Sequence, residues 1–224
     1  MKINISNIPT HLKETDRWVC WEEQMRNGKK TKIPKSPVDG VDFASTSDPD
    51  TWGSFSDAIK TLRNEEYDGV GFVFTTEGEY VGVDLDDCRD PESGEFQDWA
   101  VDIMETLDSF TEISPSGTGS HVIVKGSMPD GRKRRGDLEM YEDGRYFTVT
   151  GEVVSKHGAL IDEPRGIVER TDELREVANE YLDENEDGSS EAKAVDVDVS
   201  IDEIETDPTA VGAEKTGSGE LNGL

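Results

Sequence analysis

The chain has 224 residues, enough for one ordinary domain and a tail. It carries 51 acidic and 23 basic residues, and its formal net charge of −28 disfavours non-specific attraction to nucleic acid or to an anionic membrane. Its two cysteines, Cys20 and Cys88, lie outside any Cys-x-x-Cys or Cys/His pattern, which argues against zinc and against a disulfide framework. The chain shows no signal sequence and no apolar run of membrane length, so we expect a cytoplasmic protein.

The N-terminal third combines a hairpin with one helix. A short helix is predicted at Pro9–Lys13, and strands at Trp18–Trp21 and Lys29–Pro34 flank Asn27-Gly28, a strong hairpin signal. Residues 37–51 are rich in turn residues and predict a loop. Apolar residues then recur at helical spacing through Ser54–Arg63, with Ser47 or Asp48 as the candidate helix cap.

The middle of the chain alternates short strands with helices. We predict two hairpins, Gly69–Phe74 with Tyr80–Asp86 and Asp137–Tyr141 with Tyr146–Thr150, because turn residues separate each pair of apolar runs. Helices are predicted at Phe96–Leu107 and Thr171–Tyr181, and strands at Thr111–Ser114 and Ser120–Lys125. This mixture without a βαβ rhythm favours an α+β fold with a largely antiparallel sheet.

The composition changes after Leu182. Residues 183–224 contain no aromatic residue and are rich in Asp, Glu, Gly and Ser, so they are unable to bury enough surface to offset the entropy of ordering. The expected organisation is a globular domain over residues 1–182 and a disordered acidic tail over residues 183–224.

Asp84 and Asp86 are the central candidates for chemistry. Alternate side chains leave a strand on opposite faces, so both carboxylates are expected on one face while Val83 and Leu85 pack on the other. Two adjacent carboxylates repel unless a cation lies between them, and Mg²⁺ favours such oxygen ligands. The chain holds 25 aspartates and chance alone gives about three Asp-x-Asp pairs, so the pair needs support from its surroundings.

Three downstream features supply that support. The glycine loop Ser116-Gly117-Thr118-Gly119 exposes backbone N–H groups that suit a phosphate, and His121 follows on a strand where it could donate to a phosphate oxygen. Glu139 lies between apolar neighbours in Leu138–Tyr141 and could be a third metal ligand. Arg145 could bind a phosphate with two hydrogen bonds, aided by Thr148 or Thr150. Structural alternatives are a simple hairpin loop, a core histidine and a surface cation that answers excess acid.

In this order the motifs resemble the archaeo-eukaryotic primase superfamily, and more closely the bifunctional primase–polymerase domains of phage and plasmid replication proteins. The resemblance spans about residues 8–160. It rests on these segments, quoted in chain order: Arg17-Trp18-Val19-Cys20-Trp21, Gly28-Lys29-Lys30-Thr31-Lys32-Ile33-Pro34, Thr51-Trp52, Gly69-Val70-Gly71-Phe72, Gly82-Val83-Asp84-Leu85-Asp86, Ser116 to His121, Leu138-Glu139-Met140-Tyr141 and Gly144 to Gly151.

The resemblance implies an RRM-like catalytic sheet joined to an N-terminal α/β subdomain. It implies Mg²⁺ or Mn²⁺ held by Asp84, Asp86 and Glu139, although many relatives carry Asp at the third position. It also implies a nucleotide site at Ser116, Gly117, Gly119, Ser120 and His121, to which we add Arg145 and Thr148.

The implied activity is nucleotidyl transfer, which joins NTPs or dNTPs on a single-stranded DNA template in the replication of a plasmid, virus or chromosome. Two basic clusters are expected to contact the template, and they consist of Lys29, Lys30, Lys32 and Lys35 and of Arg132, Lys133, Arg134 and Arg135. No helicase domain is evident, so a separate replicative helicase is an expected partner. The acidic composition resembles that of salt-loving archaea, which suggests a haloarchaeon or its virus or plasmid as the source. The alternatives are an inactive DNA-binding replication accessory and a metal-dependent nuclease or phosphohydrolase.

Overall fold

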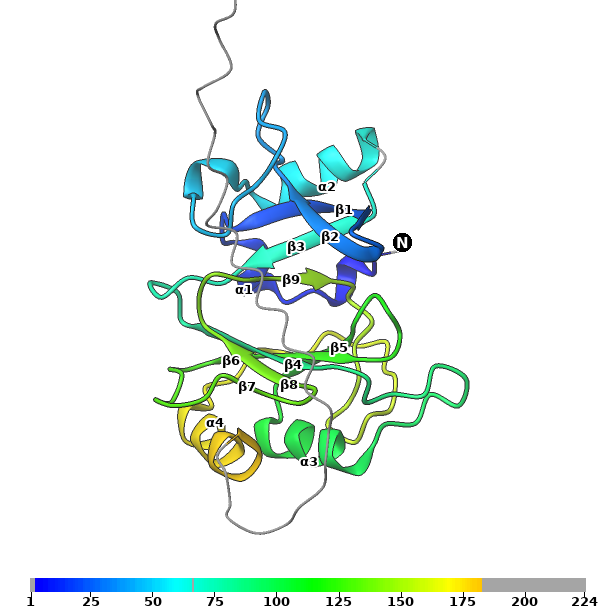
Figure 1. Cartoon of the computed structure of the whole chain (residues 1–224), viewed down its shortest axis with the longest axis vertical. Coiled ribbons are helices and arrows are strands. Elements are labelled where there is room, and N and C mark those ends of the chain that lie inside the picture. Colours follow the sequence, from blue (N-terminus) through cyan, green and yellow to red (C-terminus); the bar gives the residue numbers. More distant parts are fainter. Residues whose placement is uncertain (1–2, 66, 183–224) are drawn as a thin grey trace, which may run out of the picture. The chain divides into compact units, whose positions relative to one another are not determined.

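The structure, a computed structural model, describes residues 3–65 and 67–182, all within one compact unit. The tail expected at residues 183–224 lies outside the described residues. The described chain forms two antiparallel sheets with helices packed against them, as Figure 1 shows. The predicted α+β class with antiparallel pairing is therefore confirmed, and no helix in the described part of the chain is long and apolar enough to cross a membrane.

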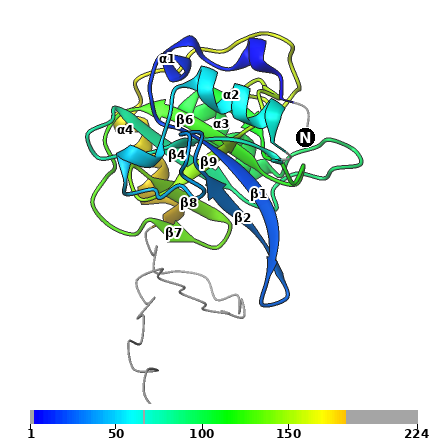
Figure 2. The same ribbon diagram turned by 90° about the horizontal axis from the view of Figure 1, so that it is seen from above.

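The first sheet has the strand order β2-β1-β3-β9. Its strands are β1 (Trp18–Arg26), β2 (Lys29–Lys35), β3 (Gly69–Val73) and β9 (Tyr146–Val149). The predicted turn at Asn27-Gly28 is confirmed: both residues have positive φ angles, 50° and 79°, and β1 pairs with β2 around them. The hairpin extends beyond the other strands of the sheet (Figure 2).

Two helices belong to the N-terminal part of the chain. Helix α1 (Thr10–Lys13) precedes β1, and α2 (Phe55–Asn64) lies between β2 and β3 in the sequence. Trp18, Phe72 and Phe147 of the first sheet belong to one apolar cluster with Ala58 and Ile59 of α2. The cap of α2 is Ser54, whose side chain accepts a hydrogen bond from the backbone N–H of Asp57 at 3.1 Å. The predicted cap was wrong, because Asp48 instead caps the 3₁₀ turn Pro49–Thr51.

The second sheet has the strand order β5-β6-β4-β8-β7. Its strands are β4 (Tyr80–Leu85), β5 (Phe110–Ile113), β6 (Ser120–Lys125), β7 (Arg134–Arg135) and β8 (Leu138–Tyr141). Its helices are α3 (Asp98–Leu107) and α4 (Thr171–Val177), and α4 continues into the π-helical turn η3 (Ala178–Leu182).

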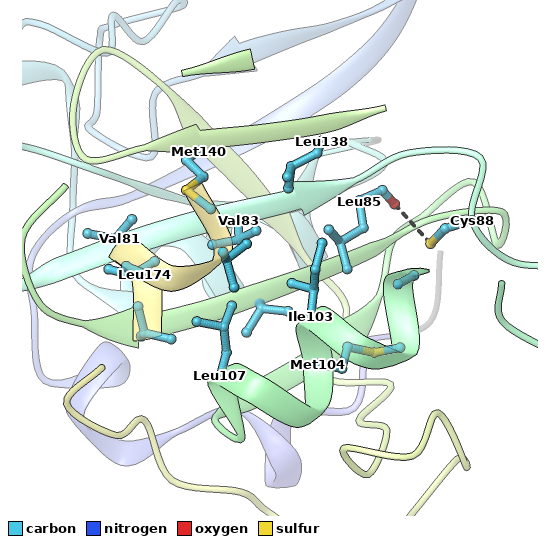
Figure 3. Close-up of a cluster of buried hydrophobic side chains, with 14 of the residues drawn as sticks. Val81, Val83, Leu85, Cys88, Ile103, Met104, Leu107, Leu138, Met140 and Leu174 are labelled. Atoms are coloured by element: carbon cyan, nitrogen blue, oxygen red, sulfur yellow. Dashed lines mark hydrogen bonds between the residues drawn. The ribbon is translucent and has the colours of Figure 1, made fainter. Parts of the chain in front are cut away.

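Side chains on β4 alternate between two environments. Val81, Val83 and Leu85 point to the face that α3 and α4 cover, where they meet Ile103 and Leu107 (Figure 3). The opposite face, here called the inner face, is turned toward the first sheet. Tyr80, Phe110 and Ile123 of the inner face share an apolar cluster with the aromatic residues of the first sheet. The inner face therefore places its polar residues between the two sheets.

Both predicted hairpins after residue 65 were wrong. The turn after β3 forms, with the N–H of Gly78 donating to the carbonyl of Thr75 at 2.7 Å, but β3 pairs with β1 and β9 while β4 pairs with β6 and β8. The predicted partners β8 and β9 likewise belong to different sheets. Each of these turns carries the chain from one sheet to the other, because both edges of β3 and of β4 are occupied by more distant strands.

Candidate active site

Five charged or titratable side chains form one row across the inner face of the second sheet. Strand register places Glu112 opposite His121, His121 opposite Asp84, Asp84 opposite Glu139, and Glu139 opposite Arg134. Each strand of the sheet contributes one member, since residues in register on neighbouring antiparallel strands leave the sheet on the same face. The predicted residues Asp84, His121 and Glu139 are thus brought together by the fold.

The row alternates in charge over most of its length. Nε2 of His121 lies 3.6 Å from Oδ1 of Asp84, and Nδ1 lies 3.5 Å from Oε1 of Glu112. At the other end, Nε of Arg134 lies 2.8 Å from Oε1 of Glu139. Asp84 and Glu139 are neighbours of like charge at the centre, so that position is where a cation is most strongly favoured.

Asp86 follows the last residue of β4 and remains accessible to solvent. Its backbone N–H donates to the carbonyl of Asp137 at 2.8 Å, which continues the pairing toward β8. Partial burial against neighbouring protein and the charges of Asp84 and Glu139 raise the pKa of Asp86 to about 6. Burial likewise raises the pKa of Glu139, and Asp84 adds to this shift while Arg134 opposes it. The charge of Asp84 therefore contributes to the raised pKa of both Asp86 and Glu139.

His121 occupies a narrow space between the sheets. Its ring stacks on Phe147 with centroids 4.6 Å apart and planes 26° apart, and its side chain is 6% exposed. Burial alone lowers the pKa of the imidazole, but Glu112 and Asp84 outweigh it and the net pKa is raised. A buried imidazole between two carboxylates is therefore favoured as the cation.

The glycine loop packs against the end of β4. A Cβ atom at Gly119 would meet the carbonyl of Leu85 at 2.7 Å and Cα of Asp86 at 3.5 Å, so only glycine permits this approach. Within the loop, Gly117 has φ +78°, and the hydroxyl of Ser116 lies within hydrogen-bond distance of the Ser114 and Thr118 hydroxyls. The predicted phosphate loop thus lies beside Asp86.

The other predicted nucleotide contacts differ in their surroundings. The hydroxyl of Ser120 is buried and donates to the carbonyl of Glu112 at 2.9 Å, on the face opposite to Asp84. Arg145 is exposed, lies over the ring of Tyr141 at 5.1 Å and acts electrostatically on Glu139. Thr148 is buried on β9 in register with Gly71. Arg145 is therefore the one of these three that faces solvent.

Acidic partners accompany much of the first predicted DNA-binding cluster. Lys30 lies 2.7 Å from Glu23, and Lys35 lies 3.3 Å from Glu22 and over the ring of Phe43. Lys29 lies exposed at the start of β2. Lys32 differs from these because its ammonium lies over the ring of Trp21; burial lowers its pKa, and the charges of Asp84 and Asp86 oppose that shift. Lys32 thus belongs electrostatically to the acidic cluster.

The second predicted cluster lies on and beside the edge strand β7. Arg134 pairs with Glu139, Lys133 lies 3.9 Å from Asp143, and Nη1 of Arg135 donates to the carbonyl of Tyr181 at 3.4 Å. Arg132 is exposed to solvent and, like the other three, interacts with a neighbouring group. The cluster therefore supplies Arg134, the last of the five residues in the row on the inner face.

Sequence reasoning missed Glu112. This carboxylate is fully buried, and its Oε2 accepts hydrogen bonds from the N–H of Thr150 at 3.1 Å, the Thr150 hydroxyl at 3.3 Å and the N–H of Gly151 at 2.8 Å. The available signal was an acid inside a short apolar strand, the same pattern that singled out Glu139. Register to His121 becomes visible only once β5 and β6 are paired.

The donor chemistry of the cluster fits a divalent cation. Asp84, Asp86 and Glu139 supply hard carboxylate oxygens, and Asp84 and Glu139 are direct neighbours across β4 and β8. In residues 3–65 and 67–182, no three acidic, histidine or cysteine side chains converge closely enough to hold a metal ion. Glu139, now paired with Arg134, would have to turn toward Asp84 to complete a site.

Comparison with known proteins finds a relative of part of this chain. A DNA primase-polymerase of Nitratiruptor phage NrS-1 is 40% identical over 143 residues, which cover 61% of this chain and 19% of the phage protein. The chain is therefore homologous to part of a phage DNA primase-polymerase and spans about a fifth of its length. No protein-family model matches the chain.

Proposed function

We propose that the chain is the catalytic part of a primase–polymerase, a metal-dependent nucleotidyltransferase that makes or extends primers on single-stranded DNA. The observation that carries this proposal is the row of Asp84, Glu139 and His121 on one sheet face beside the glycine loop, in a chain homologous to a DNA primase-polymerase. In this proposal the second sheet, in which α3 lies between β4 and β5 in the chain, is the RRM-like catalytic sheet.

Each part of the site has a role in this reaction. Asp84 and Asp86, with Glu139 once it has turned from Arg134, would hold Mg²⁺ or Mn²⁺. The metal would stabilise the charge that develops on the attacking and leaving oxygens. His121 and the loop Ser116–Gly119 would bind the triphosphate of an NTP or dNTP, and Arg145 lies where its guanidinium could join them. Charge stabilisation and positioning account for most catalysis of phosphoryl chemistry, so no separate acid–base pair is required.

Template binding would use the exposed cations at the margins of the acidic row. The exposed side chains of Lys29 on the β1–β2 hairpin and of Arg132 to Arg135 at and beside β7 would contact the phosphate backbone. Lys32 is better placed to meet the phosphates of the nucleotide, because its charge interacts with Asp84 and Asp86. A replicative helicase as partner and a salt-rich cell as source remain part of the proposal.

The direct test is synthesis on a primed single-stranded template with labelled dNTPs or NTPs and Mg²⁺ or Mn²⁺ in concentrated KCl. We expect the Asp84→Asn/Asp86→Asn variant to lose at least about 100-fold in rate, since metal-ion stabilisation contributes several kcal/mol. The matched control is Asp48→Asn/Asp50→Asn, which alters an exposed Asp-x-Asp pair in the first half of the chain and leaves an asparagine able to cap. Thermal melting with and without Mn²⁺ adds a second readout. The metal should raise the melting temperature of the wild type and of the control variant, but not that of Asp84→Asn/Asp86→Asn.

Other products would contradict the proposal. A folded wild type that binds template without extending any primer would indicate a replication accessory. Shortening of the labelled strand that depends on Asp84 would indicate a nuclease.

A further inference from the structure

Glu112 is the one fully buried carboxylate in the described inner face, and its two oxygens have different partners. Oε2 accepts all three hydrogen bonds from Thr150 and Gly151, at the end of β9 in the first sheet. Oε1 has no hydrogen-bond partner in this arrangement, although Nδ1 of His121 lies 3.5 Å away. Because Oε2 already accepts three hydrogen bonds, Oε1 is the oxygen that remains for the histidine.

Nδ1 of His121 is also buried without a hydrogen-bond partner. Leaving a buried donor and a buried carboxylate oxygen both unpaired is unfavourable, and each is the nearest available partner for the other. A movement of a few tenths of an ångström would bring the pair within ordinary hydrogen-bond length. Only an Nδ1–H that donates to Oε1 satisfies both atoms, since an ionised carboxylate accepts but does not donate.

This pairing fixes how the imidazole presents its other nitrogen. Phe147 stacks on one face of the ring and restricts its plane, while Glu112 restricts rotation within that plane. Nε2 is then directed at Asp84, 3.6 Å away, at the centre of the acidic row. A carboxylate that orients a histidine through its far nitrogen is a recurrent device at functional sites.

We propose that Glu112 is a positioning residue of the nucleotide site: it holds Nδ1–H of His121 so that Nε2 faces Asp84 and the incoming triphosphate. The inference deepens the proposed function and rests on it for the identity of the ligand. The same carboxylate also links β5 to the end of β9, because it accepts hydrogen bonds from Thr150 and Gly151. A shift of the first sheet relative to the second would therefore move Glu112 and, with it, the imidazole.

The Glu112→Gln variant separates positioning from packing. The glutamine carbonyl can still accept from Thr150 and Gly151, but its amide then presents N–H groups to His121 and forces Nδ1 to accept. We expect the KM for the nucleotide to rise about tenfold or more, as for loss of one hydrogen bond to a charged group, while the affinity for template DNA is unchanged. A residue that only packs would leave the KM as it is.

Nitrogen NMR supplies a readout that does not depend on activity. The chain has three histidines, so their ring signals are readily told apart. Wild-type His121 should carry a proton on Nδ1 that exchanges slowly with solvent, and in Glu112→Gln this nitrogen should be unprotonated. The matched control is Glu105→Gln, because Oε1 of Glu105 lies 2.6 Å from Nδ1 of His157 on the exposed surface, and this variant should move only the His157 signals.

The outcomes distinguish this inference from the proposed function. An unprotonated Nδ1 in wild-type His121 would overturn the inference without need of any variant, even if Glu112→Gln failed to fold. An unchanged KM in a folded, active Glu112→Gln would overturn it while the polymerase assignment stood. A wild type without polymerase activity would remove the proposed ligand, yet the nitrogen spectrum would still decide whether Glu112 orients His121.

Discussion

Gly82 on β4 lies on the inner face, two residues before Asp84, and is turned toward the first sheet. A Cβ atom there would meet the ring of Phe147 at 2.5 Å and that of Phe74 at 2.7 Å. Phe147 is the same ring that stacks on His121, so crowding at Gly82 would also displace the imidazole. The absence of a side chain at this position therefore sets the spacing between the sheets.

We predict that Gly82→Ala lowers the free energy of unfolding by about 1–3 kcal/mol, the usual cost of overpacking a filled interior. Guanidinium titration at fixed KCl concentration measures it. The control Gly166→Ala places a methyl group where no atom lies within 4 Å, and it should be nearly neutral. Equal stability of Gly82→Ala and wild type would mean that the sheets separate more easily than the packing indicates.

The two cysteines behave as buried apolar side chains. Burial raises the pKa of both Cys20 and Cys88 to about 12, and each thiol donates to a backbone carbonyl, of Ala58 and Leu85 respectively (the latter bond is drawn in Figure 3). Only the thiolate is nucleophilic, and a raised pKa keeps the thiolate fraction negligible at neutral pH.

We therefore predict that neither thiol of the folded protein reacts rapidly with a disulfide reagent such as DTNB, and that both react in guanidinium. Absorbance of the released thiolate counts the reactive groups. Rapid reaction of one equivalent in the native protein would show that a cysteine is accessible.

Residue identity singled out the three candidate acids but not Glu112, the carboxylate beside His121. Asp84 and Asp86 stood out as an alternating pair expected on one strand face, and Glu139 as an acid between apolar neighbours, and the fold places Asp84 opposite Glu139 with Asp86 close by. Glu112 has the same local pattern, yet its role depends on register with His121 and on contacts with Thr150 and Gly151 in the other sheet. Such contacts between distant segments have no signature in the nearby sequence.

At the scale of elements, α2 illustrates a local signal that was available and was misread. The sequence offers several polar residues before the helix, and the structure uses the last of them, Ser54, directly before Phe55. Its hydroxyl satisfies the N–H of Asp57, one of the otherwise unpaired donors of the first turn.

We predict that Ser54→Ala destabilises the protein by about 1 kcal/mol, the typical loss for removing such a cap. Lys60→Ala changes an exposed side chain on the same helix away from the cap and is expected to be close to wild type. Chemical denaturation of both variants makes the comparison, and equal losses would argue against a specific capping role.

Strand pairing was harder to predict than strand position. The expected segments are close to β3, β4, β8 and β9, because apolar alternation and turn residues are local. Their partners depend on which arrangement buries both faces of each strand. Val81 and Val83 require α3 and α4 on one face of β4, and Phe72 and Phe147 are brought to its other face by a separate sheet. Neighbours in sequence were consequently assigned to the same hairpin when they belong to different sheets.

For the whole molecule, the net charge of −28 makes the sequence a poor guide to a nucleic-acid ligand. It argued against a polyanionic ligand, while the expected chemistry depends on a few cations placed within an acidic background. Pairs such as Lys30–Glu23 and Lys133–Asp143 show that many of these cations are balanced by nearby acids. Template affinity should therefore come from a limited set of contacts.

Such a charge also predicts how stability depends on salt. Like charges repel one another more strongly in a compact chain than in an unfolded one, and the screening length falls from about 30 Å at 0.01 M salt to about 3 Å at 1 M. We predict that the melting temperature rises steadily from millimolar to molar KCl at neutral pH, followed by circular dichroism. Because the screening length changes most in the first few tenths of a molar, most of the rise is expected there, and a rise that begins only near 1 M would point to a cause other than repulsion. A melting temperature that is flat or falls with KCl would show instead that repulsion among the carboxylates contributes little to the unfolding of this chain.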